Sequence, residues 1–326
     1  MSRPSLSVAF VLLPDFTLTP FAGLVDVLRL AADDGDGSRP RRFRWQVVGD
    51  APVRSSAGTV VTPDRRLADA DRFDYLVVCG GLLRAEREAD PALVAFIRRH
   101  AAHATVVGLC TASFTLAAAG LLDGRRACVS WFHHAEFREA FPAIAVSASE
   151  LFVIDGPVVT CAGGSAAIDV GAWIVERHLG AATARKALDI LVAAETRAPD
   201  TPQPHRVSST LADARLKKAA LLVEQRLGDP PSVARLAAAV GLSRRQLERL
   251  FVAETGRSPR QYLVDARLAQ ARWLMATTTR TLTDIAGETG FGDASQFSRA
   301  YLRARGVTPS RDRPALRRPA GDAPAA

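Results

Sequence analysis

The 326-residue sequence lacks any apolar run long enough to cross a membrane, which takes about 18 consecutive residues. Its N-terminal apolar stretch, residues 6–13, stops at Pro14 and Asp15 without the small-residue cleavage site of a signal peptide. We therefore expect a soluble cytoplasmic protein without a membrane partner.

Cysteine is scarce, and the four copies include no Cys-x-x-Cys pair. Disulfide frameworks and zinc sites need grouped cysteines, so the sequence predicts neither, and we expect no metal and no cofactor. Any special cysteine chemistry must come from a single thiol. An apolar content of 48% excludes a wholly disordered chain, and the length suits about two domains. The cysteines are Cys79, Cys110, Cys128 and Cys161.

Lysine is nearly absent, since 39 of the 42 basic residues are arginine. Residues 1–195 contain 20 basic against 22 acidic side chains, whereas residues 213–312 contain 17 against 10. A basic C-terminal part indicates a polyanionic partner such as nucleic acid. An arginine-rich coding bias would give the same excess, so charge alone leaves both explanations open.

Strand-like and helix-like segments alternate through residues 1–195, which favours an α/β layered domain with a largely parallel sheet. Asp155 and Gly156 predict the turn of a hairpin within 151–160. We expect strands at 7–13, 44–48, 75–79 and 105–109, and helices at 21–32, 91–100, 114–122 and 166–179.

Three prolines between residues 197 and 205 predict a linker, which we place at 196–212. The pattern is helical over 213–312. A tail rich in Pro, Ala and Gly at 313–326 predicts disorder.

The helical part contains one unit twice. Gly241 recurs as Gly290 after 49 residues, and Gln246 recurs as Gln296 after 50 because one residue is inserted. Each copy predicts a helix, a turn that uses glycine, and a second helix. This order is typical of a helix-turn-helix.

The second helix of each copy has one predicted buried stripe and one polar face. Leu247, Leu250 and Phe251 form the stripe in the first copy, which turns Arg245 and Arg249 outward. A lone exposed arginine would be ordinary solvated surface, but two equivalent faces in a basic domain favour binding of double-stranded DNA, because Arg and Gln pair with guanine and adenine edges. The candidate DNA-binding residues are Ser243, Arg244, Arg245, Gln246, Arg249, Ser295, Gln296, Ser298 and Arg299.

Apolar residues at Tyr262, Ala266, Ala269 and Trp273 predict one long helix over 259–276 between the copies. A rigid spacer would place the two recognition helices in successive major grooves, about 34 Å apart.

The motifs LAAAVGLSRRQLERLF (236–251), TGRSPRQYLVDARLAQARWLM (255–275) and DIAGETGFGDASQFSRAYLRARGVTPS (284–310) resemble the AraC/XylS DNA-binding domain. The resemblance implies an all-α, homeodomain-like domain over 213–312 and a sequence-specific transcription regulator that contacts RNA polymerase. The short side chains of Ala294 and Ser295 depart from a base-reading pattern, so base contacts from the second copy are the weaker expectation.

Cys110 lies where an apolar strand passes into a helix, in the stretch TVVGLCTAS (105–113). A thiol on such a turn is close to a helix N-terminus, which favours the thiolate and offers N–H groups to an oxyanion. A small buried cysteine that acts as a hydrophobe would fit the same pattern.

Stretches at 8–31, 77–81, 106–131 and 152–170 resemble the ThiJ/PfpI branch of the glutamine-amidotransferase-like fold. Joined to the AraC-type end, residues 1–195 resemble the N-terminal domain of GlxA-family transcription regulators. This implies a flavodoxin-like domain that senses an effector and forms a homodimer, with Cys110 at the position of the nucleophile in enzymatic relatives.

Two departures from the enzymatic relatives predict a degenerate elbow. Pro20 stands where they carry an acidic residue, and Ser130 precedes Trp131 where a histidine is usual. A nucleophilic cysteine needs a base or a cationic neighbour, so we expect no catalysis. The alternatives are a cysteine-dependent amidohydrolase or isonitrile-hydratase-like enzyme with an appended DNA-binding domain, and a redox switch at Cys110.

We expect the former active-site cleft to bind a small effector instead. An amino-acid-derived or quaternary ammonium metabolite would fit, because Trp131 and Phe21 offer cation–π contacts, although both rings would also suit a core. The candidate effector-binding residues are Phe21, Gly80, Gly81, Cys110, Thr111, Trp131 and His133.

Overall fold

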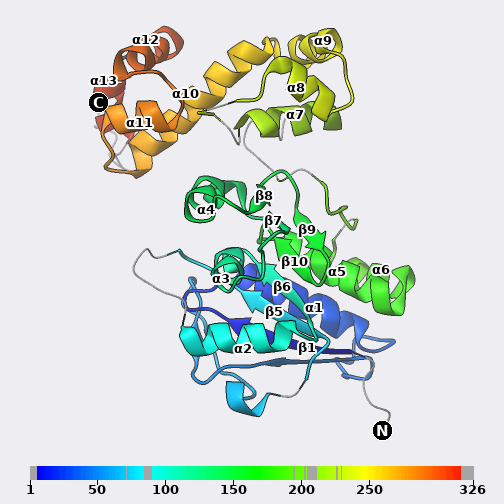
Figure 1. The fold of residues 1–326 in the computed structure, drawn as a ribbon. Coiled ribbons are helices and arrows are strands. Elements are labelled where there is room, and N and C mark those ends of the chain that lie inside the picture. The colour runs from blue at the N-terminus through cyan, green and yellow to red at the C-terminus, as the bar shows by residue number, and fades with distance from the viewer. Residues whose placement is uncertain are drawn as a thin grey trace, which may run out of the picture. The chain divides into compact units, whose positions relative to one another are not determined.

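The computed structural model in Figure 1 describes residues 6–70, 72–83, 90–193, 195–201, 203, 211–224, 227–228 and 230–316. The chain divides into two compact units, Met1–Gln203 and Pro204–Ala326. In the part that is described, no helix is both long and apolar enough to span a membrane.

A six-stranded sheet forms the centre of the first unit and confirms the predicted α/β class (Figure 1). Every neighbouring pair is parallel except the antiparallel hairpin of the last two strands. All five residues of the third strand in sheet order are buried, as expected when helices cover both faces. The order is β2 (Phe43–Val47), β1 (Leu6–Leu12), β5 (Tyr75–Cys79), β6 (Thr105–Leu109), β10 (Val158–Cys161) and β9 (Phe152–Asp155).

Two hydrophobic cores lie on opposite faces of this sheet, because successive strand residues point to opposite sides. Val8 and Phe10 of β1 belong to one core, whereas Ala9 and Val11 belong to the other. The first core is covered by α1 (Leu18–Ala31), α5 (Ala166–Leu179) and α6 (Ala181–Ile190), and the second by α2 (Pro91–Ala101) and α3 (Ala112–Ala118).

Several short elements have no counterpart in the sequence prediction. Strands of two or three residues carry no readable period, so their pairing depends on the rest of the fold. They are the antiparallel pair β3 (Val53–Arg54) and β4 (Val60–Val61), the parallel pair β7 (Arg126–Cys128) and β8 (Ala145–Ser147), the 3-10 turns Leu67–Asp69 and Trp131–His133, and helix α4 (His134–Ala140).

The described residues of the predicted linker up to Gln203 are bonded to the first unit. The Pro199 carbonyl accepts hydrogen bonds from the backbone N–H groups of Leu151 (2.9 Å) and of Phe152 (3.3 Å), the first residue of the edge strand β9. Arg197 forms an ion pair with buried Asp169 at 2.6 Å. Proline content does not reveal these hydrogen-bond and ion-pair partners. The described residues up to Gln203 therefore differ from the linker that we expected, because they are held to the first unit.

Helices alone make up the described part of the second unit, as predicted. The long helix α10 serves two cores: Tyr262 packs into the first and Leu268 and Met275 pack into the second. The predicted single long helix over 259–276 is therefore confirmed; of the four residues that predicted it, Ala269 is exposed, whereas Trp273 is half-buried against the second core. The helices are α7 (Ala214–Glu224), α8 (Val233–Ala239), α9 (Arg244–Thr255), α10 (Pro259–Thr277), α11 (Leu282–Glu288), α12 (Ala294–Arg305) and α13 (Pro309–Leu316).

The expected disorder from residue 313 onward is wrong for 313–316, which continue α13. Arg313 donates hydrogen bonds to the carbonyls of Thr278 (3.0 Å) and Arg280 (2.5 Å), and the hydroxyl of Tyr301 donates to Asp312 (2.5 Å). These contacts fix the last helix to the second core. Residues 317–326 lie outside the described part of the chain.

Candidate functional sites

The first helix-turn-helix consists of α8 and α9, joined by a glycine turn. Gly241 has φ +67°, a conformation that other residues resist. Ser243 begins α9 with a capping box: its Oγ accepts from the backbone N–H of Gln246 (3.3 Å), and Gln246 Oε1 accepts from the Ser243 N–H (2.8 Å). The start of the recognition helix is thus held by two of the predicted DNA-binding residues.

The second copy, α11 and α12, repeats this arrangement with different caps. Gly290 has φ +80°, and Asp293 caps α12 by accepting from the Gln296 N–H at 2.6 Å. Gln296 Oε1 accepts from the Gly292 N–H at 2.7 Å. We predicted Gln246 and Gln296 as base-reading residues. In both, the side-chain oxygen accepts a hydrogen bond from a backbone N–H group just before the residue's own helix.

Arg245 and Arg249 lie on the exposed side of α9, and Arg299 lies on that of α12. Leu247 and Phe251 on the opposite side of α9 are fully buried, as predicted. Arg244 pairs with Glu248 at 2.9 Å, whereas no ion pair of Arg245, Arg249 or Arg299 is recorded among the described residues. Ser243, Arg244, Arg245, Gln246, Arg249, Ser295, Gln296 and Arg299 are exposed, and Ser298 is half-buried.

Cys110 occupies a strained turn between β6 and α3. Its φ of +59° lies in the left-handed region, which is uncommon for a residue other than glycine and costs about 1–3 kcal/mol. Its N–H donates to the Cys161 carbonyl at 3.1 Å. Gly163 lies so close that a Cβ there would be 2.8 Å from the Cys110 Cβ. The elbow predicted from the sequence is therefore present.

Gly80, Gly81, Cys110 and Thr111 come together where β5 and β6 end. A Cβ on Gly80 would lie 2.2 Å from the backbone nitrogen of Ala112, so only glycine fits beside the elbow. The hydroxyl of Thr111 donates to the Gly81 carbonyl at 2.9 Å. These four candidate effector residues form one cluster at the carboxyl ends of parallel strands, where ligands of open α/β sheets bind.

Thr17 is a neighbour of Cys110 that the sequence analysis missed. Its Oγ1 lies 3.6 Å from the Cys110 Sγ. In the described chain no carboxylate or histidine is recorded in contact with this sulfur, and Pro20 is buried in α1. A threonine hydroxyl does not act as a general base near neutral pH. None of the contacts described for Cys110 is therefore a group that would accept the thiol proton.

The other three cysteines are buried inside the domain. Burial raises the pKa of the Cys161 thiol to about 12, and it raises the pKa values of Cys79 and Cys128 well above the usual value. Cys110 alone is partly exposed. Across the residues that the structure describes, no group of three or more His, Cys, Asp or Glu is placed to hold a metal ion.

Phe21 reaches this cluster indirectly, because it packs on Phe16, which bridges to Gly81. Phe21 packs edge-on against Phe10 and Phe16, with ring centroids 5.4 and 5.7 Å apart, which is a core role. His133 Nδ1 lies 2.6 Å from Glu136 Oε2, and Trp131 is 37% exposed. The contacts recorded for Cys110 in the described chain include none of Phe21, Trp131 and His133.

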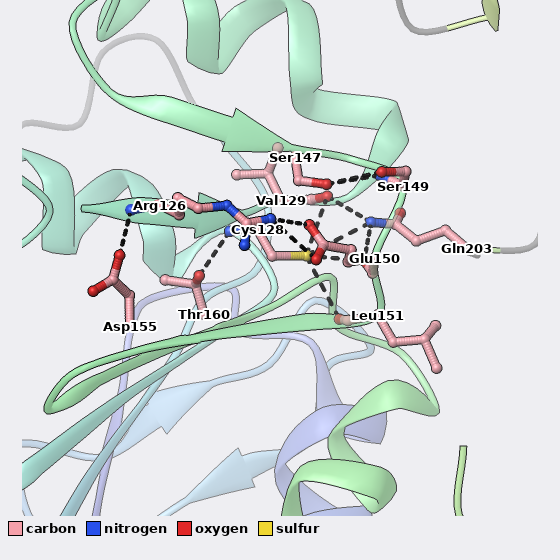
Figure 2. A network of polar contacts seen from close by, with 10 residues as sticks. All are labelled: Arg126, Cys128, Val129, Ser147, Ser149, Glu150, Leu151, Asp155, Thr160 and Gln203. Carbon is pink, nitrogen blue, oxygen red and sulfur yellow. Dashed lines mark hydrogen bonds and ion pairs between the residues drawn. The ribbon is translucent and has the colours of Figure 1, made fainter. Parts of the chain in front are cut away.

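Gln203, the last residue of the first unit, is a second residue that the sequence analysis missed (Figure 2). It is 3% exposed, and its Nε2 donates to the carbonyls of Val129 and Glu150, both at 2.8 Å. Its Oε1 accepts from the Trp131 N–H at 2.9 Å. A polar residue between two prolines gives no sequence signal of such burial.

A cavity of about 170 Å³ lies at the opposite ends of the strands from Cys110. Val106 and Val158, which line it, belong to the first halves of β6 and β10. No candidate effector residue lines this cavity. The lining is Ala101, Val106, Gly120, Leu121, Asp123, Arg125, Pro157 and Val158.

Comparisons with known proteins match both units. A family model described as the DJ-1/PfpI family matches residues 7–177, and a helix-turn-helix domain model matches residues 236–315. The HTH-type transcriptional regulator GbdR of Pseudomonas aeruginosa is 32% identical over 96% of this chain and 85% of its own. Isonitrile hydratase of Pseudomonas putida is 30% identical over 66% of this chain and 91% of its own.

Among solved structures, an AraC family transcriptional regulator from Pseudomonas putida has 26% identity and a TM-score of 0.50, over 57% of this chain and 99% of that chain. The fold and the sites thus define a transcription regulator in which a DJ-1/PfpI domain precedes an AraC-type helix-turn-helix domain. Within that class the chain belongs to the GlxA family, since the HTH-type transcriptional regulator GlxA of Rhizobium meliloti is 30% identical over 98% of this chain and 98% of its own.

Proposed function

We propose that this regulator binds a specific operator through both helix-turn-helix copies and that a small effector bound by its DJ-1/PfpI domain controls it. The observation that carries the DNA half is the pair of equivalent exposed faces, with Arg245 and Arg249 on α9 and Arg299 on α12. Each guanidinium can donate two hydrogen bonds to a guanine in the major groove.

The degenerate elbow supports binding rather than catalysis in the first unit. Cys110 keeps its strained geometry, but its recorded side-chain neighbour is the neutral Thr17 hydroxyl. The effector class is an amino-acid-derived or quaternary ammonium metabolite, for which the exposed ring of Trp131 offers a cation–π contact. Dimerisation through residues 1–195 would place two DNA-binding ends on paired half-sites, beside RNA polymerase.

Operator binding is tested with the full-length protein and DNA selected from a random pool at one stated salt concentration. Arg245→Ala and Arg299→Ala should each weaken operator binding by about 5- to 150-fold, equivalent to about 1–3 kcal/mol, and relax the preference at one base. Arg185→Ala, an exposed arginine of the first unit, is the control. Equal binding of every sequence would overturn the proposal.

Effector binding is tested by thermal stabilisation of the full-length protein with a panel of L-amino acids, simple amines and quaternary ammonium compounds such as choline. A true ligand should raise the unfolding midpoint by an amount that grows with the logarithm of its concentration once that concentration exceeds Kd. Trp131→Leu should weaken binding of a cationic ligand more than that of a neutral one. No stabilisation by any member of the panel would contradict this effector class.

A second candidate function is isonitrile hydration, which the 30% identity to isonitrile hydratase and the left-handed turn at Cys110 favour. The reaction adds water to an isonitrile and yields an N-substituted formamide. Formamide production by the wild type that is lost in Cys110→Ala would support an enzyme. Absence of turnover at high protein concentration, together with operator binding, would leave the regulator.

A further inference from the structure

Val252 on α9 and Leu302 on α12 are exposed aliphatic residues at equivalent positions, 50 residues apart, in the two recognition helices. The two residues are 54% and 46% exposed. Neither belongs to the hydrophobic core of its own copy. Single exposed aliphatic residues are ordinary, but the recurrence at one position of a repeated unit calls for a shared role.

Both residues lie on the face that carries the arginines. Arg245, Arg249 and Val252 follow the spacing i, i+4, i+7, so at about 100° per residue they fall within about 60° of the helix circumference. Fully buried Leu247 lies on the opposite side.

Ser295, Arg299 and Leu302 have the same spacing on α12. Each face therefore presents two polar positions followed by one aliphatic side chain, which lies about 10 Å further along the helix than the first position. The homeodomain recognition helix reads bases with this spacing.

We propose that Val252 and Leu302 determine specificity by each contacting the 5-methyl group of a thymine. This rests on the proposed operator binding. In the major groove the apolar group that distinguishes one base from the others is this methyl. The 10 Å offset corresponds to about three base pairs at about 3.4 Å each, so the thymine lies about three pairs from the base opposite residue 245 or 295.

The test replaces each thymine of the selected operator in turn with uracil, which removes only the methyl group. Wild-type affinity should fall about three- to tenfold at one thymine for each helix, a range typical of loss of a buried methyl contact. Val252→Ala should bind the normal operator with affinity reduced by the same factor and should no longer distinguish thymine from uracil at its position. Leu302→Ala should do so at the second position.

Val192→Ala, which shortens a 91% exposed valine in the first unit, is the matched control and should retain wild-type sensitivity to uracil. Alanine favours helix, so both helix variants should keep the wild-type unfolding midpoint. The inference is overturned if no uracil substitution changes operator binding, or if Val252→Ala still distinguishes thymine from uracil. Either result leaves the proposed operator binding intact. Failure to select any preferred DNA overturns the proposed function as well.

Discussion

At the scale of single residues, the four cysteines differ in access and in the cost of ionisation. We predict that only Cys110 reacts rapidly with a thiol reagent in the native protein at pH 8. Burial raises the pKa of Cys161 to about 12 and raises the pKa values of Cys79 and Cys128 well above normal, so very little thiolate forms at those sites. Mass spectrometry of the alkylated peptides identifies the modified cysteine.

The control for this prediction is the unfolded protein, in which all four thiols should react at similar rates. Raising the pH from 8 toward 10 should increase the slow reaction of buried thiols, since a raised pKa moves their ionisation to higher pH. Cys110→Ser should abolish the fast phase. Rapid native labelling of Cys161 would contradict the buried environment.

Alanine substitutions at Gly163 and Gly164 distinguish the cost of a steric clash from the cost of backbone strain beside the elbow. Both have positive φ, +92° and +57°, but a Cβ on Gly163 would meet Cys110 at 2.8 Å, whereas a Cβ on Gly164 would meet nothing within 4 Å. Gly164→Ala should therefore cost about 1–2 kcal/mol of unfolding free energy from strain alone. Gly163→Ala should cost about 1–3 kcal/mol more.

Denaturant unfolding measures both costs. In the double variant Gly163→Ala with Cys110→Gly, the Cβ and Sγ of Cys110 are gone while its Cα, 2.9 Å from the added Cβ, remains, so the extra cost should shrink in part. If the two substitutions simply added, the close approach between these residues would not be the cause.

At the scale of elements, the capping box of α9 connects helix stability to DNA binding. Ser243→Ala removes the oxygen that accepts from Gln246 and should cost about 0.5–2 kcal/mol. Ser258→Ala removes an equivalent box, with Gln261, from the spacer helix α10 and should cost the same. Only Ser243→Ala should also weaken operator binding several-fold, because Ser243 begins the helix proposed to enter the major groove. Equal losses of operator affinity in both variants would show a stability effect alone.

The long elements could be predicted because their patterns are local. The buried strands β1, β5 and β6 are mainly apolar runs, and the recognition helices have clear periods with glycine turns. The spacer helix α10 was predicted as one helix, but the residues that it buries were only partly predictable, because it contacts two cores with two different faces.

The neighbours within each site could not be predicted in the same way. Thr17 meets Cys110 across 93 residues of sequence, and Gln203 meets Val129 and Trp131 across 74 and 72. Such contacts depend on how distant segments pack. Gln203 belongs to no motif, and Thr17 lies in the 8–31 stretch, which gives no signal of a contact with Cys110. The glycines around the elbow were predictable as a cluster, since parallel strands bring their carboxyl ends to one edge.

At the scale of the whole molecule, the first unit should unfold separately from the second, and Gln203 should affect only the first. Gln203→Ala removes the hydrogen bond from the Trp131 N–H and a donor from the Val129 and Glu150 carbonyls. Losing these hydrogen bonds should cost about 1–3 kcal/mol. For a unit of this size, each kcal/mol lowers the unfolding midpoint by about 2–4 °C.

Calorimetry of the full-length protein tests this, with the transition that operator DNA raises assigned to the second unit. In Gln203→Ala the other transition should move to lower temperature while operator affinity without effector stays at the wild-type value. Asp200→Ala, an exposed substitution three residues earlier, should move neither transition. A fall of both transitions in Gln203→Ala would contradict the prediction, because it would mean that the stability of the second unit also depends on Gln203.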